Sequence, residues 1–117
     1  MSRILVVDDD QASARTLELH LRAQGFETSV AHDAEAGLAR ASEWRPDLVI
    51  LDVRMPGRSG LEVLPDLKAL DPRLHVVVIT AFHDMETTIE AMQKGAEEYI
   101  HKPVDVDELD AAVVRLL

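Results

Sequence analysis

Three short runs of aliphatic residues constrain the fold of this chain more than any other feature of its sequence. They lie within the predicted strands 3–7, 47–51 and 75–80. The runs are nearly unbroken and consist of leucine and β-branched residues, as expected of strands that are covered on both faces. Longer segments with helical spacing of apolar residues separate them. Strands that alternate with helices in this way predict a parallel sheet between two layers of helices.

The remaining elements complete a regular alternation. Further strands are predicted at 27–31 and 98–101, and the more polar 27–31 suits an edge of the sheet. Helices are predicted at 10–24, from a cap at Asp33 through Ala41, from a capping box at Ser59 and Glu62 through Leu67, at 84–94 and at 105–116. Pro65 is expected close enough to a helix start for its missing N–H to cost little.

The predicted fold is α/β, a (βα)5 doubly wound three-layer sandwich with a flavodoxin-like parallel five-stranded sheet. The strand order 2-1-3-4-5 is adopted by analogy with other sheets of this kind, in which ligands bind beyond the strand C-termini. A chain of 117 residues without a Ser-, Pro- or Gly-rich linker predicts one domain, 1–117.

Composition narrows the classes of partner. Twelve basic and 22 acidic residues give a formal net charge of −10, which argues against nucleic-acid binding by this domain. The absence of cysteine excludes disulfides and thiolate metal sites. The apolar run near the N-terminus is too short for a signal peptide or a membrane span. We therefore expect a soluble, cytoplasmic protein without membrane contact.

Polar residues follow four of the predicted strands. They are Asp8, Asp9 and Asp10 after the first strand, Asp52 after the third, Thr80 at the end of the fourth and Lys102 after the fifth. Because the carboxyl ends of parallel strands share one edge of a sheet, we expect acids, a hydroxyl and an amine to converge there.

Such a gathering of carboxylates favours a bound cation. Two carboxylates about 5 Å apart repel by roughly 3 kcal/mol at an effective dielectric constant near 20. Lys102 supplies only one positive charge to balance them. Mg²⁺ prefers one or two carboxylates together with waters and phosphate oxygens. The residues therefore predict a magnesium site at which Asp52 can act as a nucleophile toward phosphorus.

Four segments resemble the motifs of the receiver domains of bacterial response regulators. They are Val7-Asp8-Asp9-Asp10, Leu51-Asp52-Val53-Arg54-Met55-Pro56-Gly57, Thr80-Ala81 and Tyr99-Ile100-His101-Lys102-Pro103. Their order and spacing match over essentially the whole chain. The resemblance implies a phosphorylation-dependent switch of a two-component system, which accepts a phosphoryl group from a sensor histidine kinase. It implies no enzyme activity beyond the domain's own phosphoryl transfer and slow self-dephosphorylation.

The resemblance also implies roles for the acidic residues. Asp52 corresponds to the phosphoacceptor of the family. Asp9 and Asp52 correspond to direct ligands of Mg²⁺, Asp8 to a ligand that acts through water, and Arg54 to a residue whose backbone carbonyl binds the ion.

Other positions correspond to the switch. Thr80 and Lys102 match the hydroxyl and the amine that contact the phosphoryl group, and Tyr99 matches the aromatic residue that turns inward on activation. Lys102-Pro103 matches a cis peptide bond. The signal is then expected to leave through the face formed by the fourth helix, fifth strand and fifth helix, toward an output domain or effector protein or through a phosphorylation-dependent homodimer.

The stretch from Thr80 to Ala96 is most similar to receivers of nitrogen-regulation-type transcriptional activators, so we expect a role in transcription regulation. In this family the second residue after the acceptor and the second after the threonine modulate the lifetime of the phosphoryl group. Here they are the bulky Arg54 and Phe82, which predict slow self-dephosphorylation. The sequence does not tell whether an output domain follows Leu117.

Several alternatives stay open at this point. Asp8 to Asp10 fit a turn and a helix cap, with Asp10 the best candidate for a cap alone. The pattern Asp8-x-Asp10 also fits a phosphohydrolase of the haloacid-dehalogenase type. A flavodoxin-like flavin binder and a receiver that works unphosphorylated as a scaffold are weaker alternatives. The five histidines share no metal-ligand spacing and are expected at surface or hydrogen-bonded positions.

Overall fold

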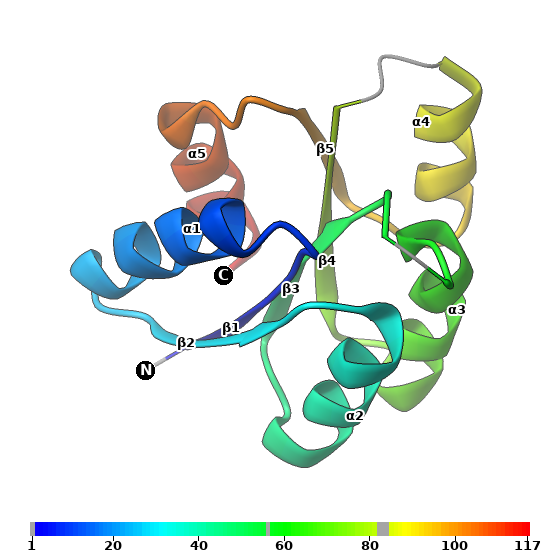
Figure 1. Ribbon diagram of the computed structural model, residues 1–117, viewed down its shortest axis with the longest axis horizontal. Coiled ribbons are helices and arrows are strands. Elements are labelled where there is room, and N and C mark those ends of the chain that lie inside the picture. The colour runs from blue at the N-terminus through cyan, green and yellow to red at the C-terminus, as the bar shows by residue number, and fades with distance from the viewer. Residues whose placement is uncertain (1, 56, 82–84) are drawn as a thin grey trace.

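The computed structural model of this chain describes residues 2–55, 57–81 and 85–117. Strands and helices alternate along it (Figure 1), and each predicted element is present. The ends lie within one residue of the prediction, except that the second and third helices continue three residues beyond Ala41 and Leu67. The strands are β1 (Arg3–Val7), β2 (Glu27–Ala31), β3 (Leu48–Asp52), β4 (His75–Thr80) and β5 (Glu98–His101). The helices are α1 (Gln11–Ala23), α2 (Ala34–Trp44), α3 (Gly60–Leu70), α4 (Met85–Gln93) and α5 (Val106–Leu116). Within this described part, no helix combines the length and apolar character needed to cross a membrane.

The strands form one parallel sheet in the predicted order β2-β1-β3-β4-β5. The (βα)5 fold class is therefore confirmed. The more polar β2 lies at an edge, as its composition predicted. The central strand β3 is buried along its whole length, because it has a strand on either side and helices above and below.

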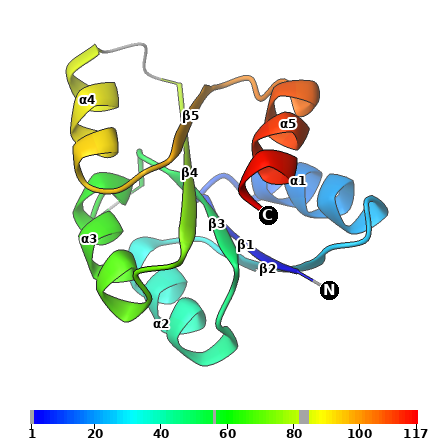
Figure 2. The ribbon, with the colours of Figure 1, turned by 180° about the vertical axis from the view of Figure 1, so that it is seen from behind.

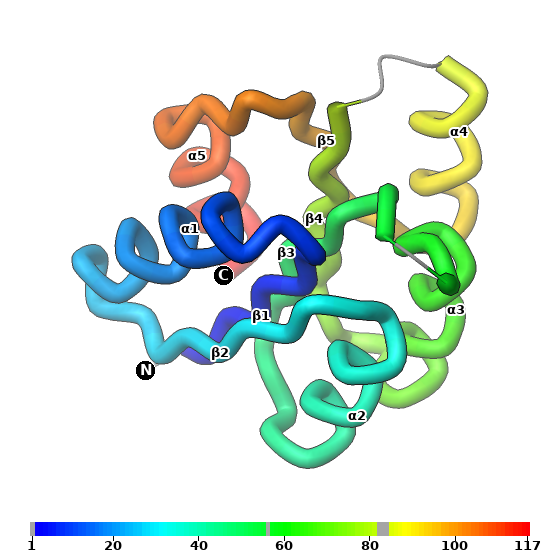
Figure 3. Tube along the Cα trace, viewed as in Figure 1, coloured from blue at the N-terminus to red at the C-terminus, as the bar shows by residue number. Residues whose placement is uncertain are grey.

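Alternation along each strand divides the core into two layers. In β1, Ile4 and Val6 pack with residues of α1 and α5, whereas Leu5 and Val7 pack with residues of α2, α3 and α4. Figure 2 shows the two helix layers from behind, and the trace in Figure 3 follows the chain as it passes between them. This period of two is the property of strands that lets one short aliphatic run serve both layers.

Side chains at the helix starts stabilise them, and the sequence indicated Asp10, Asp33 and the Ser59–Glu62 pair but not Asp105. Asp10, Asp33 and Asp105 each accept hydrogen bonds from backbone N–H groups at the start of α1, α2 and α5. At α3 the predicted capping box is complete, because Ser59 Oγ accepts from the Glu62 N–H and Glu62 Oε1 accepts from the Ser59 N–H.

The expectation for Pro65 is wrong. Helix α3 begins at Gly60, so Pro65 is its sixth residue and lies beyond the first turn. The N–H that proline lacks would have bonded to the carbonyl of Leu61. Lys94 from the end of α4 donates to that carbonyl instead, with Nζ 3.3 Å from the oxygen. A contact between two helices therefore satisfies the group that the proline leaves without its helical partner.

Arg45 ends α2 in the left-handed region, with φ 56° and ψ 65°. Because a Cβ disfavours this conformation, we expect Arg45→Gly to stabilise the protein by about 1 kcal/mol, measured by urea denaturation. Arg45→Ala is the matched control, since it removes the same exposed side chain but keeps the Cβ. Equal stability of the two variants would contradict the explanation.

Candidate functional site

The carboxyl ends of four strands bring the predicted polar residues to one rim of the sheet. Strand pairing places Val7 beside Leu51, Asp52 beside Ile79 and Thr80 beside His101. Asp8 and Lys102 follow directly after β1 and β5. Residues that are far apart in the chain are therefore neighbours in space, as the parallel topology predicted.

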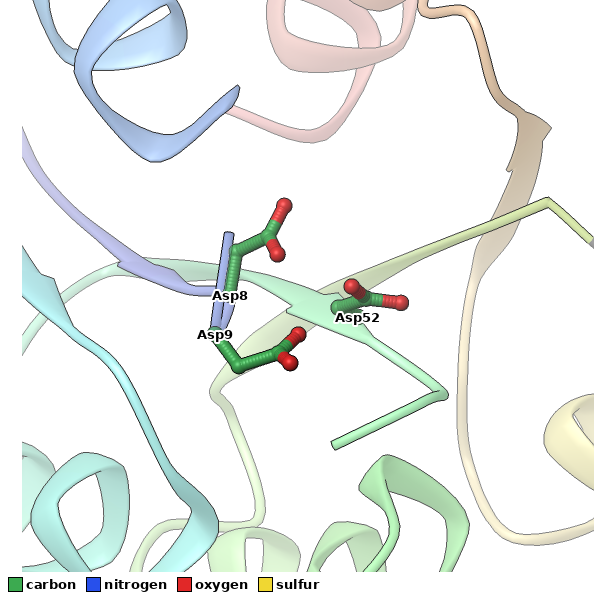
Figure 4. A group of neighbouring side chains, drawn as sticks. All are labelled: Asp8, Asp9 and Asp52. Atoms are coloured by element: carbon green, nitrogen blue, oxygen red, sulfur yellow. The ribbon is translucent and has the colours of Figure 1, made fainter. Parts of the chain in front are cut away.

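Three carboxyl groups lie together at this rim (Figure 4). Asp8, Asp9 and Asp52 each offer one carboxylate oxygen, and these oxygens lie within 4.8 Å of one another. Asp8 and Asp52 are 0% and 3% exposed, whereas Asp9 is exposed. The donors are all hard oxygens with one side open to solvent, which fits a divalent cation that keeps part of its water shell. The arrangement thus has the donor chemistry that Mg²⁺ requires.

Lys102 bridges two of these acids. Its Nζ lies 3.0 Å from Asp8 Oδ2 and 3.0 Å from Asp52 Oδ2, so one ammonium group is shared by both carboxylates. Its backbone N–H donates to the carbonyl of Thr80 at 2.7 Å, which attaches the end of β5 to the end of β4. The predicted convergence of the amine with the acids is confirmed in position, and one positive charge faces three carboxyl groups.

The electrostatics of the cluster perturb its pKa values. Burial and the neighbouring Asp8 carboxyl raise the pKa of Asp52 from 3.8 to about 6, although Lys102 partly offsets them. Burial alone would lower the pKa of Lys102, but the carboxylates of Asp52 and Asp8 outweigh it and raise that pKa above its ordinary value. Lys102 therefore stays charged at neutral pH, and ionised Asp52 lacks full compensation.

Asp10 does not belong to the acidic cluster. Its carboxylate accepts hydrogen bonds from the N–H groups of Ala12 and Ser13 and from Ser13 Oγ, which also lower its pKa. Its own N–H donates to Asp8 Oδ1 at 2.9 Å. Asp10 is thus a helix cap that also orients Asp8, as the alternative reading of this residue proposed.

The remaining predicted residues lie around the cluster. The N–H of Arg54 donates to Asp52 Oδ1 at 3.1 Å. Thr80 is completely buried at the end of β4, and Tyr99 packs its partly buried ring edge-on to His101, with ring centroids 5.1 Å apart. The peptide bond Lys102-Pro103 is cis, as the resemblance implied. Phe82 lies outside the described residues.

Alternation places these residues on two faces of the sheet. Asp52 follows the side of Leu48 and Ile50, which pack against α1 and α5. Thr80 follows the side of Val76 and Val78, which pack on the other face together with Tyr99. Asp52 and the pair Thr80–Tyr99 therefore share the rim but belong to opposite layers.

Two residues near the cluster carried no signal in the sequence analysis. His32 Nδ1 lies 3.0 Å from the backbone carbonyl oxygen of Asp8. At Gly60, an added Cβ would overlap the backbone carbonyl of Asp52. Both contacts involve backbone atoms of an acidic residue distant in sequence, so neither residue type nor local spacing could indicate them.

Comparison with known proteins distinguishes between the receiver and the phosphohydrolase interpretations of this acidic cluster. A family model described as the response regulator receiver domain matches residues 4–114. The chain belongs to this family. The phosphohydrolase alternative is disfavoured, since the family is one of regulators and Asp10 serves as a cap.

Regulatory proteins of similar sequence support the assignment of the chain to the receiver family. The receiver is 38% identical over 117 residues to the regulatory protein AtoC of Escherichia coli and 39% identical over 114 residues to the transcriptional regulatory protein ZraR of Salmonella typhimurium. These matches cover 100% and 97% of the receiver but 25% and 26% of the relatives, so the chain spans about a quarter of their length. The expected similarity to nitrogen-regulation-type activators is confirmed by these relatives.

A solved structure resembles the receiver along its whole length. The crystal structure of response regulator protein TrrA from Thermotoga maritima, in complex with Mg(2+)-BeF, superimposes with a TM-score of 0.91 and 35% identity. The match covers 100% of each chain. The flavodoxin-like fold assigned from the strand order is therefore shared with an experimentally determined receiver.

Proposed function

We propose that this domain is a signalling switch that accepts a phosphoryl group on Asp52 from a sensor histidine kinase, in the presence of Mg²⁺. The observation that carries the proposal is the placement of the buried Asp52 carboxylate beside those of Asp8 and Asp9, with the Lys102 ammonium 3.0 Å away. A solitary buried acid would need no such surroundings, whereas a phosphoacceptor needs both cationic stabilisation and an open side for its donor.

Each residue of the cluster has a proposed task. Asp9 and Asp52 bind Mg²⁺ directly, together with the backbone carbonyl of Arg54, and Asp8 binds it through water. When bound, the ion neutralises charge on the phosphoryl oxygens. The Mg(2+)-BeF complex of the related TrrA supports this choice of metal. The raised pKa of Asp52 gives a physical reason for cation binding at this site. A cation relieves the repulsion between the carboxylates, which contributes to the raised pKa.

The transfer itself uses groups of this chain. An oxygen of the Asp52 carboxylate attacks phosphorus, the bond from phosphorus to the donor breaks, and the leaving group departs with the electron pair. The Arg54 N–H holds Oδ1 of Asp52 and Lys102 holds Oδ2, so the carboxylate is oriented before the donor arrives. Lys102 then stabilises the charge on the transferred group.

The proposed response begins at Thr80. Phosphorylation replaces the single carboxylate charge of Asp52 by the almost two negative charges of the phosphoryl group, and a hydroxyl that bonds a phosphoryl oxygen favours the modified state alone. Thr80 and Tyr99 lie on the same face of adjacent strands, which supports a coupled movement. Such a movement would reshape the face of α4, β5 and α5.

Helices α4 and α5, which contribute to this proposed output face, carry exposed apolar side chains. Met85 and Ile89 on α4 are 72% and 48% exposed, and Val114 on α5 is 76% exposed. This supports an output domain, an effector protein or a phosphorylation-dependent homodimer as the partner. Transcription regulation is proposed because AtoC and ZraR are named as regulators and are longer than this chain. Direct contact with nucleic acid is not proposed, given the net charge of −10, and the cytoplasmic location stays a prediction.

Intact-protein mass spectrometry tests the proposal. Incubation with acetyl phosphate and Mg²⁺ is expected to add one phosphoryl group, and Asp52→Asn is expected to abolish the adduct. Asp10→Asn is the control, because it removes a neighbouring charge but preserves a helix cap. Multiple-turnover release of phosphate from organic phosphates, dependent on Asp8, would instead support the hydrolase.

The lifetime of the adduct gives a separate prediction. Replacement of Arg54 and Phe82 by small residues is expected to accelerate self-dephosphorylation several-fold, because bulky side chains at these positions would hinder the attacking water. The decay of the adduct after removal of acetyl phosphate measures this rate. An unchanged decay would contradict the steric explanation.

A further inference from the structure

The backbone of Asp8 is held at both of its polar atoms by the end of β2. Its N–H donates to the carbonyl of Ala31 at 3.0 Å, which continues the pairing of β1 with β2 by one bond. Its carbonyl oxygen lies 3.0 Å from Nδ1 of His32. Because a carbonyl oxygen can only accept, Nδ1 carries the proton and donates. A side chain therefore contacts the carbonyl where the strand pairing ends.

The hydrogen bond to the Asp8 carbonyl also affects the orientation of Asp9. The C=O of Asp8 and the N–H of Asp9 belong to one planar peptide unit, so a bond to the carbonyl restricts rotation of the plane from which Asp9 departs. Asp9 is exposed, and among the described residues no hydrogen bond to its carboxylate is found. The direction of that carboxylate thus depends on the backbone that carries it.

Asp8, by contrast, is held independently through its side chain. Asp10 donates to one of its carboxylate oxygens and Lys102 to the other. Loss of the His32 contact would consequently leave the Asp8 carboxylate in place and release mainly the peptide plane and Asp9. His32 and Asp9 also line the same surface cavity, so the ring and the affected carboxylate are close neighbours.

We infer that His32 is a positioning residue for the cation site, which orients Asp9 through the carbonyl of Asp8. This inference rests on the proposed function, in which Asp9 is a direct ligand of Mg²⁺. A ligand that is already oriented loses less freedom when the ion binds, and groups that orient ligands affect metal affinity. We therefore expect His32 to change the affinity for Mg²⁺ and not the rate of phosphoryl transfer once the ion is bound.

Two variants of similar size separate the hydrogen bond from the bulk of the ring. In His32→Asn the amide nitrogen occupies a place equivalent to Nδ1 and keeps a donor, whereas His32→Leu removes it. Calorimetric titration with Mg²⁺ is expected to give a dissociation constant about fivefold weaker for His32→Leu, as for the loss of one ordinary hydrogen bond. For His32→Asn we expect a value within about twofold of the wild type.

Two further readouts distinguish positioning from a general loss of structure. The nitrogen spectrum of the neutral ring is expected to report the Nδ1–H form in the metal-free wild type. With acetyl phosphate, His32→Leu is expected to need more Mg²⁺ for half-maximal phosphorylation while reaching the wild-type rate at saturating Mg²⁺. An Nε2–H ring, unchanged Mg²⁺ affinity of His32→Leu, or equal weakening in both variants would overturn the inference.

Failure of the proposed function gives a different result. If wild-type protein forms no adduct on Asp52 under saturating Mg²⁺ and acetyl phosphate, the switch is wrong. The titrations of the three proteins with Mg²⁺ alone still decide whether His32 orients the cation site.

Discussion

Asp52→Asn is expected to raise the melting temperature of the metal-free protein, despite removing the proposed phosphoacceptor. Asp52 is 3% exposed and shares a single ammonium with Asp8. Its raised pKa, about 6, means that ionisation destabilises the folded state relative to the unfolded chain. At about pH 8 we expect a gain of about 1–2 kcal/mol, below the full value of the shift because asparagine matches its two donors less well. Calorimetry would then record an increase of about 4–8 °C.

The sign of the pH dependence follows from the same shift. Between about pH 4 and pH 6, the folded wild type retains a proton on Asp52 that the unfolded chain has lost. Stability of the wild type therefore falls as the pH rises through this window, and the loss is complete above it. The advantage of Asp52→Asn is accordingly expected to be largest above about pH 6 and to vanish near pH 4.

Mg²⁺ provides the discriminating condition. An ion that binds only the folded protein stabilises it by mass action, and Asp52→Asn removes one of the proposed ligands. The difference in melting temperature is therefore expected to shrink or reverse when Mg²⁺ is added. Asp10→Asn, which removes an exposed charge outside the cluster, is expected to give no comparable gain. An unchanged or lower melting temperature of metal-free Asp52→Asn would refute the electrostatic account.

Gly60→Ala is expected to destabilise the protein by about 3 kcal/mol. Gly60 begins α3, and its N–H donates to the carbonyl of Val53 at 2.8 Å. A Cβ there would overlap the carbonyl oxygen of Asp52 and lie 2.9 Å from its carbonyl carbon. These are backbone atoms of a buried strand end, so the contact cannot be relieved by a change of rotamer. Either α3 moves outward or the end of β3 shifts.

Gly57→Ala is the matched control in the same connection. Gly57 has φ +77° but has no atom within 4 Å of an added Cβ, so alanine there introduces backbone strain without overlap. Its expected cost is only about 1 kcal/mol. Urea denaturation of both variants measures the difference. Equal costs would show that conformational preference, and not the contact with Asp52, explains the glycine at 60.

The fold was predictable because its main signals are local. An unbroken run such as Leu48–Leu51 indicates a strand that is covered on both faces whatever surrounds it, and the Ser59–Glu62 pair indicates a helix start by spacing alone. The site was predictable for a topological reason. Once the strands are parallel, residues such as Asp8, Asp52 and Lys102 must meet at the same edge of the sheet.

Other features depend on contacts that no local pattern encodes. The carbonyl freed by Pro65 is satisfied by Lys94, which directly follows the next helix. His32 reaches the backbone of Asp8, and Gly60 touches the backbone of Asp52. Each depends on the distance between elements to within about one ångström, which packing of the complete domain determines. The local sequence patterns therefore predict the strands and helices but not the distances between them.

Because the core is divided into two layers, phosphorylation at the rim needs to change few of the contacts between buried side chains. Asp8 and Asp52 follow the side of α1 and α5, and Thr80 and Tyr99 lie on the side of α3 and α4. Both sets extend from strand ends, beyond the aliphatic side chains that fill the interior. In the proposed function, a conformational change can thus couple the two faces of the sheet through residues at its C-terminal edge. The interior side chains then keep their contacts, and the domain keeps its stability.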